Sequence, residues 1–172
     1  MHRSLLFTFI TADRPGIIDR LSGLVAAHHG NWLASRLTRL SGRFAGVVQL
    51  HIAEDNIAGL RAALAGLQDE GIAVLLDEPA GQIDDRSDGV RLSVIGLDRP
   101  GIVREIAQAL ATRQINVTDM RSSIDSAPMT GEPLFRAELA IDIPAGLAID
   151  SLHEELDMIA NRLDIDWQLG SD

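Results

Sequence analysis

The stretch that decides the fold of this 172-residue chain occurs twice. DRPGII at residues 13–18 returns as DRPGIV at residues 98–103, which is 85 positions further along (98 minus 13). Each copy follows a run of β-forming residues and opens an amphipathic helical pattern. Gly16 and Gly101 therefore stand where a strand passes into a helix. We expect free backbone N–H groups there, with no side chain in the way.

Around the first copy, residue periodicity predicts a strand at 5–10, with Phe7 and Phe9 on one face. Asp13 is predicted to cap the helix that follows, and Pro15 to be its first residue. Gly30 is expected to end that helix in the left-handed C′ position. Further elements follow in the order strand, strand, helix, strand, at residues 31–40, 44–52, about 54–70 and 72–76, with a hairpin turn at 41–43.

The second half repeats this order. Asn116 matches Asn31 at the offset of 85, whereas Phe135 matches Phe44 at an offset of 91 (135 minus 44). The difference between the two offsets predicts six extra residues in the second hairpin, around 126–133. This insertion is a candidate contact loop for a partner; alternatively, its Met129 packs back on its own domain.

The repeat predicts two α+β domains at 1–78 and 90–172, joined by an acidic linker at 79–89. The β-α-β-β-α-β order predicts a ferredoxin-like fold, in which a four-stranded antiparallel sheet carries two helices on one face. The other sheet face is expected to present Leu6 and Ile10 in the first domain but Arg91 and Ser93 in the second. A partly apolar open face suggests packing against another domain or subunit.

Composition narrows the function. A formal net charge of −10 and the lack of a basic stripe argue against direct nucleic-acid binding. The chain has no cysteine, and its histidines have no helical metal-ligand spacing, so neither a metal nor a cofactor is predicted. The nearest approach to a catalytic cluster is Ser122, Ser123 and Asp125, without a histidine partner in sequence. We expect a soluble, cytoplasmic protein that is not an enzyme, with no membrane segment.

A strand ending in DRPGI, a helix, then GN or IN at the next strand, all duplicated, resembles the tandem ACT-domain family. Within that family the chain is most similar to the glycine cleavage system transcriptional repressor group, including the long second hairpin at 127–135. The resemblance covers nearly the whole chain outside the linker. One departure is Gln114-Ile115 where the first repeat has His29-Gly30, so the second helix is expected to end differently.

The resemblance implies a regulator that binds a small amino acid, most simply glycine, between two paired domains. It also implies a homo-oligomer, such as a dimer, and a LysR-type DNA-binding protein partner through which transcription is controlled. Matched by position, the ligand-binding residues are Asp13, Arg14, Pro15, Gly16, Ile17 and Asn31 in the first repeat and Asp98, Arg99, Pro100, Gly101, Ile102 and Asn116 in the second.

The residues support this site on physical grounds but leave alternatives open. A helix N-terminus attracts a carboxylate, and glycine leaves the approach clear. The same residues can simply start a helix, and the two asparagines can be turn residues before a strand. Two other functions also remain: a constitutive interaction module without a ligand, and a detached regulatory half of an enzyme such as formyltetrahydrofolate deformylase.

Overall fold

The computed structural model describes residues 1–78, 90–144, 146–147 and 149–170. The chain divides into two compact units, Met1–Asp84 and Asp85–Asp172. The acidic linker predicted at 79–89 lies outside the described residues, so its character stays a prediction.

The predicted order of elements is found in both units. The first contains β1 (His2–Ala12), α1 (Ile17–Ala27), β2 (Asn31–Leu40), β3 (Arg43–Ala53), α2 (Glu54–Gly66) with a short 3₁₀ turn (Leu67–Glu70), and β4 (Ala73–Asp77). The second contains β5 (Val90–Leu97), α3 (Ile102–Thr112), β6 (Asn116–Ser126), β7 (Pro133–Asp142), α4 (Ile149–Leu163) and β8 (Ile165–Gly170).

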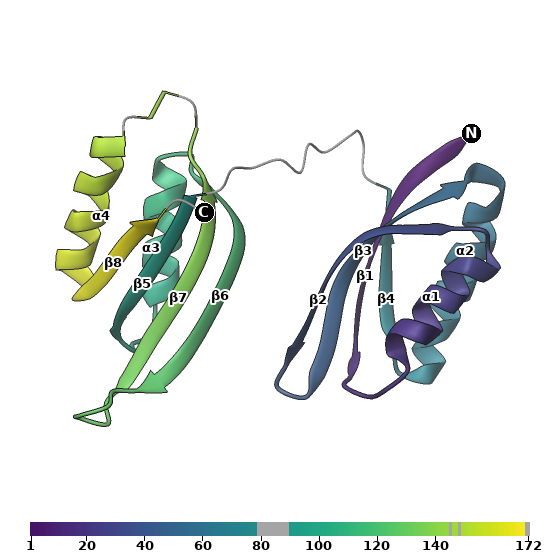
Figure 1. The fold of residues 1–172 in the computed structure, drawn as a ribbon, viewed down its shortest axis with the longest axis horizontal. Helices are drawn as coiled ribbons and strands as arrows, with labels where there is room; N and C mark the ends of the chain where they lie inside the picture. The colour runs from purple at the N-terminus through teal and green to yellow at the C-terminus, as the bar shows by residue number, and fades with distance from the viewer. Residues whose placement is uncertain (79–89, 145, 148, 171–172) are drawn as a thin grey trace. The chain divides into compact units, whose positions relative to one another are not determined.

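Each unit is a single antiparallel sheet with two helices packed on one face (Figure 1). The strand orders are β2-β3-β1-β4 and β6-β7-β5-β8, so the first strand of each unit is central and the second is an edge strand. The predicted α+β, ferredoxin-like fold is therefore confirmed for both halves of the chain.

Strict alternation on the central strands builds each core. In β1 the side chains of Leu5, Phe7 and Phe9 are buried against the helices, while Thr8 and Ile10 point to the other face. Helical spacing supplies the opposing layer, since apolar residues recur every three or four positions. The buried helix residues are Ile17, Leu21, Leu24 and Val25 in α1 and Ile102, Ile106 and Leu110 in α3.

The start of the first helix differs from the prediction. Asp13 is not its N-cap and Pro15 is not its first residue, because α1 begins at Ile17 with Gly16 in the cap position. Gly16 has a φ of 89°, a left-handed conformation that residues with a Cβ rarely adopt. The helix thus begins after the reversal at Gly16, and the Asp13 carboxylate forms an ion pair with Arg39 instead of capping the helix.

The helix end also differs from the prediction. The left-handed residue after α1 is His29, with a φ of 55°, and its counterpart after α3 is Gln114, with a φ of 58°. Gly30 is required for space instead, because an added Cβ would lie 2.8 Å from Val25 Cγ1. The amides of Gly30 and Ile115 make the same bonds, to Val25 O at 2.9 Å and Leu110 O at 3.0 Å. The two helices therefore end alike, and the expected divergence there is wrong.

The hairpins carry the main difference between the units. The turn between β2 and β3 is only Ser41-Gly42, both with positive φ, whereas residues 127–132 connect β6 to β7. The longer connection is closed by a hydrogen bond from Ala127 N–H to Glu132 O at 2.8 Å. Met129 at its tip is 98% exposed, so it does not pack back on its own domain.

Candidate functional site

The two glycine turns have nearly the same backbone. Gly101 has a φ of 94°, and its carbonyl accepts from Glu105 N–H at 3.0 Å, just as Gly16 O accepts from Arg20 N–H at 2.9 Å. The next residue, Ile17 or Ile102, is buried and anchors the turn to the core. No side chain caps either of these helix starts. Ile102 N–H makes a long hydrogen bond to Arg99 O at 3.4 Å. The other first-turn N–H groups of α1 and α3 remain available to a bound anion.

In the first unit the turn is tied to both neighbouring connections. Asp13 N–H donates to Gly42 O at 3.0 Å, and the Asp13 carboxylate lies 3.3 Å from the Arg39 guanidinium. Arg14 donates to the carbonyl of Glu70 at 2.9 Å. The Glu70 carboxylate in turn accepts from Arg20, and that hydrogen bond lowers its pKa. The two arginines thus hold the turn against the end of the 3₁₀ segment.

In the second unit the turn is held by a different ion pair, Arg99 with Glu105. Asp98 N–H donates to Pro133 O at 2.9 Å, which replaces the bond to the hairpin glycine. Arg99 reaches forward to Glu105 on α3, with 3.0 Å between Nη1 and Oε1. The hydrogen bond from Arg99 lowers the pKa of Glu105, partly opposed by burial. Both motif arginines are therefore engaged within their own unit.

An open hollow of about 470 Å³ lies beside the second turn. Four of the predicted residues line it, namely Asp98, Arg99, Gly101 and Ile102. The remaining lining comes from Val103 on α3, from Ser122, Ser123 and Ile124 towards the end of β6, and from Phe135 on β7. The hollow thus presents apolar, hydroxyl and charged groups, the kinds of group that line small-molecule sites in proteins.

The sequence pattern predicts Ser122 and Ser123 only as members of a catalytic cluster. Ser123 Oγ donates to Asp125 Oδ2 at 3.3 Å, and neither serine had been assigned to the ligand site. Their place beside the turn follows from antiparallel pairing. Leu97 at the end of β5 pairs with Leu134 on β7, and Leu134 pairs in turn with Asp125 near the end of β6. The strand order of the predicted fold, in which β7 lies between β6 and β5, would have placed these serines near the turn.

The two predicted asparagines do not lie with the turn of their own unit. Asn31 on β2 pairs with His51 on β3, and His51 pairs in turn with Ser4 near the start of β1. The glycine turn instead follows the other end of β1, at Ala12. Eight residues of strand separate Ser4 from Ala12, or about 27 Å at about 3.4 Å per residue. Asn116, aligned with Asp142, is similarly remote from Gly101. One unit alone therefore brings together the turn residues but not the asparagine.

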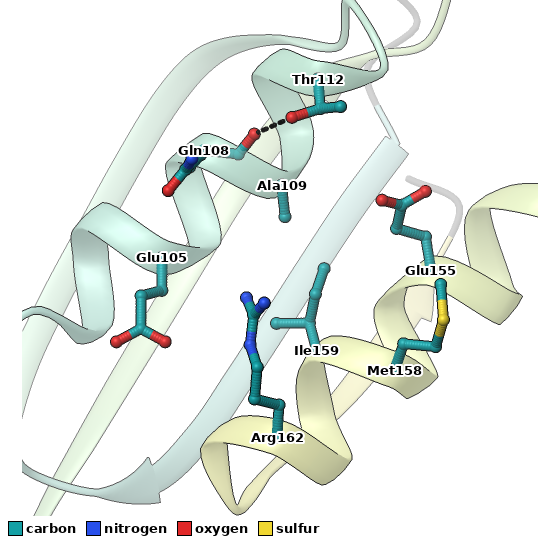
Figure 2. Close-up of a pocket in the computed structure, with 8 residues that line it drawn as sticks. All are labelled: Glu105, Gln108, Ala109, Thr112, Glu155, Met158, Ile159 and Arg162. Atoms are coloured by element: carbon teal, nitrogen blue, oxygen red, sulfur yellow. Dashed lines mark hydrogen bonds between the residues drawn. The ribbon is translucent and has the colours of Figure 1, made fainter.

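A second hollow lies between α3 and α4, on the outer side of the helices. Figure 2 shows Glu105 entering from α3 and Arg162 from α4, and the charge of Arg162 further lowers the pKa of Glu105. The other carboxylate there, Glu155, forms an ion pair with Arg113. Both carboxylates thus already have arginine partners, and we interpret this groove as part of the support for the Arg99 turn.

Other kinds of site find no support in the described part of the chain. No group of three histidine or acidic residues is arranged to hold a metal ion there. None of the helices at 1–78, 90–144 and 149–170 is long and apolar enough to cross a membrane.

The fold and the repeated turn define a protein made of two ferredoxin-like domains in tandem. Two family models, both described as the ACT domain, match residues 3–74 and 90–157. A UPF0237 protein of Methanococcus maripaludis is 33% identical over 76 residues, covering 44% of this chain and 74% of the relative. The chain belongs to the ACT-domain family.

Solved structures share the tandem arrangement of domains along the chain. A protein of unknown function from Galdieria sulphuraria gives a TM-score of 0.82 at 24% identity, covering 100% of this chain and 99% of its own. A proposed glycine cleavage system transcriptional repressor gives 0.76 at 21% identity, covering 99% and 97%. At these identities the likeness establishes the fold.

Proposed function

We propose that this chain is a non-enzymatic regulator that binds a small amino acid, with glycine the first candidate. By this proposal it controls transcription of the glycine cleavage system indirectly, through a DNA-binding protein partner of the LysR type. The observation that carries the proposal is the pair of uncapped helix starts, each behind a left-handed glycine and one of them beside a hollow. Membership of the ACT-domain family and the repressor-like fold support it.

Ligand chemistry fits these turns. The carboxylate of an amino acid is expected to accept from the free N–H groups at the start of the helix, where the helix dipole favours a negative charge. Gly16 supplies the approach, because nothing lies within 4 Å of the place where a Cβ would stand. An asparagine amide offers both a donor and an acceptor, so it can orient the ammonium end.

The complete site would be assembled from two domains. The second strand of each unit, β2 or β6, is an edge strand with one unpaired side. If two such edges pair in antiparallel fashion, the start of one strand lies beside the end of the other. That pairing brings Asn31 or Asn116 of one domain next to the glycine turn of the other. Both pairing within the chain and pairing between chains satisfy this geometry.

Isothermal titration of the full chain with glycine, serine and alanine tests the binding. We expect Gly16→Val and Gly101→Val to block the approach to the turns, and Asn31→Ala and Asn116→Ala to weaken binding by removing the amide. Asn161→Ala is the matched control, because Asn161 is exposed on α4 and is not one of the predicted ligand-binding residues. Absence of binding at millimolar ligand would contradict the proposal, as would unchanged affinity in all four site variants.

The indirect mode of control has its own test. The formal net charge of −10 favours a protein partner over DNA as the target. Because binding free energies are reciprocally linked, an amino acid that tightens the partner complex must itself bind more tightly when the partner is present. A partner complex of equal affinity with and without amino acids would instead favour a constitutive interaction module. Direct DNA binding by the isolated chain at physiological salt would contradict indirect control.

A further inference from the structure

The sheet of the first unit has an apolar face turned away from its helices. We call it the open face and define it by Leu6, Ile10, Ala45, Val47, Ala73 and Leu75. Ile10, Val47 and Leu75 are 51%, 40% and 69% exposed. The strand register places these side chains in adjoining rows, since Thr8 aligns with both Val47 and Leu75, and Ile10 with both Ala45 and Ala73. They therefore form one patch around Thr8, with the polar Gln49 and Asp77 on either side of Leu6 at one end.

The second unit provides an internal comparison for this patch. In its sheet, Ser93 stands in the place of Thr8, and its cross-strand neighbours are Glu138 and Gln168. Ile95 stands in the place of Ile10, with Arg136 and Asp166 as its neighbours. The same backbone thus tolerates charged and polar residues at these positions. The fold does not require an apolar open face, so its presence in only one unit points to something that covers it.

We propose that a second copy of this chain covers the open face, sheet against sheet. A four-stranded sheet about 19 Å wide and some 27 Å long has a projected area of about 500 Å². Two such faces then bury roughly 1,000 Å² in total, the lower bound for a specific interface. An apolar sheet packs on another apolar sheet through interdigitating side chains. The sheet of the second unit is a poor cover, because its corresponding residues are polar or charged.

The charges at the rim select the symmetry. Arg36 lies on β2 at one edge of the open face, and Asp77 lies on β4 at the other edge. A two-fold axis parallel to the strands places the β2 edge of one copy over the β4 edge of the other, so that Arg36 faces the edge that carries Asp77, two residues away along the strand. An axis across the strands would instead place Arg36 over its own counterpart, where like charges repel. The axis along the strands then passes near Thr8, between β1 and β3.

Sedimentation equilibrium on the full chain measures the assembly. Val47→Glu and Leu75→Gln give the open face the residues found at the same places in the second unit, Glu138 and Gln168. We expect either variant to halve the mass, and Val47→Glu to raise the dissociation constant at least about 30-fold, because the two-fold axis buries the new carboxylate twice. Glu138→Gln is the matched control and should leave the mass unchanged. Circular dichroism verifies that each variant is folded.

Disulfide formation tests the geometry without destabilising the fold. The chain has no cysteine, so a single introduced cysteine reports one position. We expect Thr8→Cys to form a covalent dimer under mild oxidation, and Ser93→Cys, its counterpart in the second unit, to dimerise without forming a covalent cross-link. A wild-type chain that is monomeric at 100 µM would overturn the proposal. An unchanged mass in Val47→Glu would also overturn it, and would assign the assembly to another surface, such as the β2 edge.

Discussion

Replacing Gly16 by alanine isolates the conformational demand of the first DRPG turn. The φ of Gly16 is 89°, and nothing lies within 4 Å of an added Cβ, so the substitution introduces backbone strain without a clash. An L-residue in the left-handed region costs about 1–2 kcal/mol. Alanine also lowers the entropy of the unfolded chain, which offsets part of that cost. We expect a net loss of about 1 kcal/mol.

Gly23→Ala is the control in the same helix. Gly23 also has open space around an added Cβ, but it lies within α1 with ordinary helical backbone angles. Alanine there should stabilise the unit by about 0.5–1 kcal/mol. The same chemical change, seven residues apart, is therefore expected to have opposite signs. For a domain of 60–100 residues, each kcal/mol moves Tm by about 4–8 °C.

The assay uses the distribution of tryptophan. The chain has two tryptophans, Trp32 in the first unit and Trp167 in the second, so Trp167→Phe leaves a reporter of the first unit alone. Thermal and urea unfolding followed by Trp32 fluorescence give the stability of that unit. If Gly16→Ala were as stable as its parent, or if both alanine variants shifted Tm in the same direction, the left-handed turn would not be a requirement of the fold.

Three further outcomes follow from contacts within the two units. The hydrogen bond from Arg99 lowers the pKa of Glu105, so this pair stabilises the second unit above the ordinary pKa of glutamate. That stabilisation is lost as the pH falls through the lowered pKa. In Glu105→Gln, the stability of the second unit should therefore fall less steeply with decreasing pH than in the wild type. Gly46→Ala places a Cβ 2.3 Å from a leucine methyl and should cost about 1–3 kcal/mol in urea unfolding, whereas Gly66→Ala, with open space, should not destabilise. Gly96→Ala places a Cβ 2.5 Å from an isoleucine methyl, and its loss of about 1–3 kcal/mol should appear only in the fluorescence of the second unit.

The apolar periodicity of the segments, and the turn residues between them, predicted most of the fold. The second strand was predicted at residues 31–40 and is found there, because alternation begins after one turn and ends at the Ser41-Gly42 hairpin. The offset of 91 in the second repeat predicted the insertion now seen between β6 and β7. These successes depend on local signals, in which polar turn residues interrupt apolar periods of two or about 3.6.

The helix ends were misread because glycine has more than one use. Gly16 provides a positive φ, whereas Gly30 provides room for Val25 at a close approach. A sequence shows the missing side chain but not which of these two needs it meets. The strand bulges were also missed, although they recur between Trp32 and Ala34 and between Val117 and Asp119. A bulge depends on pairing with another strand, which local periodicity does not contain.

The candidate site shows a limit of another kind. Equal offsets correctly paired Gly16 with Gly101 and Asn31 with Asn116, but an offset does not say which residues share a space. The register separates each asparagine from the turn of its own unit by the length of a strand. A site that uses both needs a second domain, and that domain is invisible to any reading of a single repeat.

A site divided between two domains has a consequence for regulation. An amino acid that binds only the paired arrangement must stabilise that arrangement, by about 2.7 kcal/mol at a ligand concentration one hundred times Kd. Pairing and binding are then linked reciprocally, so whatever strengthens the pairing also raises the ligand affinity. Dimerisation through the open face would strengthen the pairing, since a second copy held there raises the local concentration of edge strands. In this scheme the first unit supplies assembly and the turns supply sensing, which accounts for two repeats with the same turn and different sheet faces.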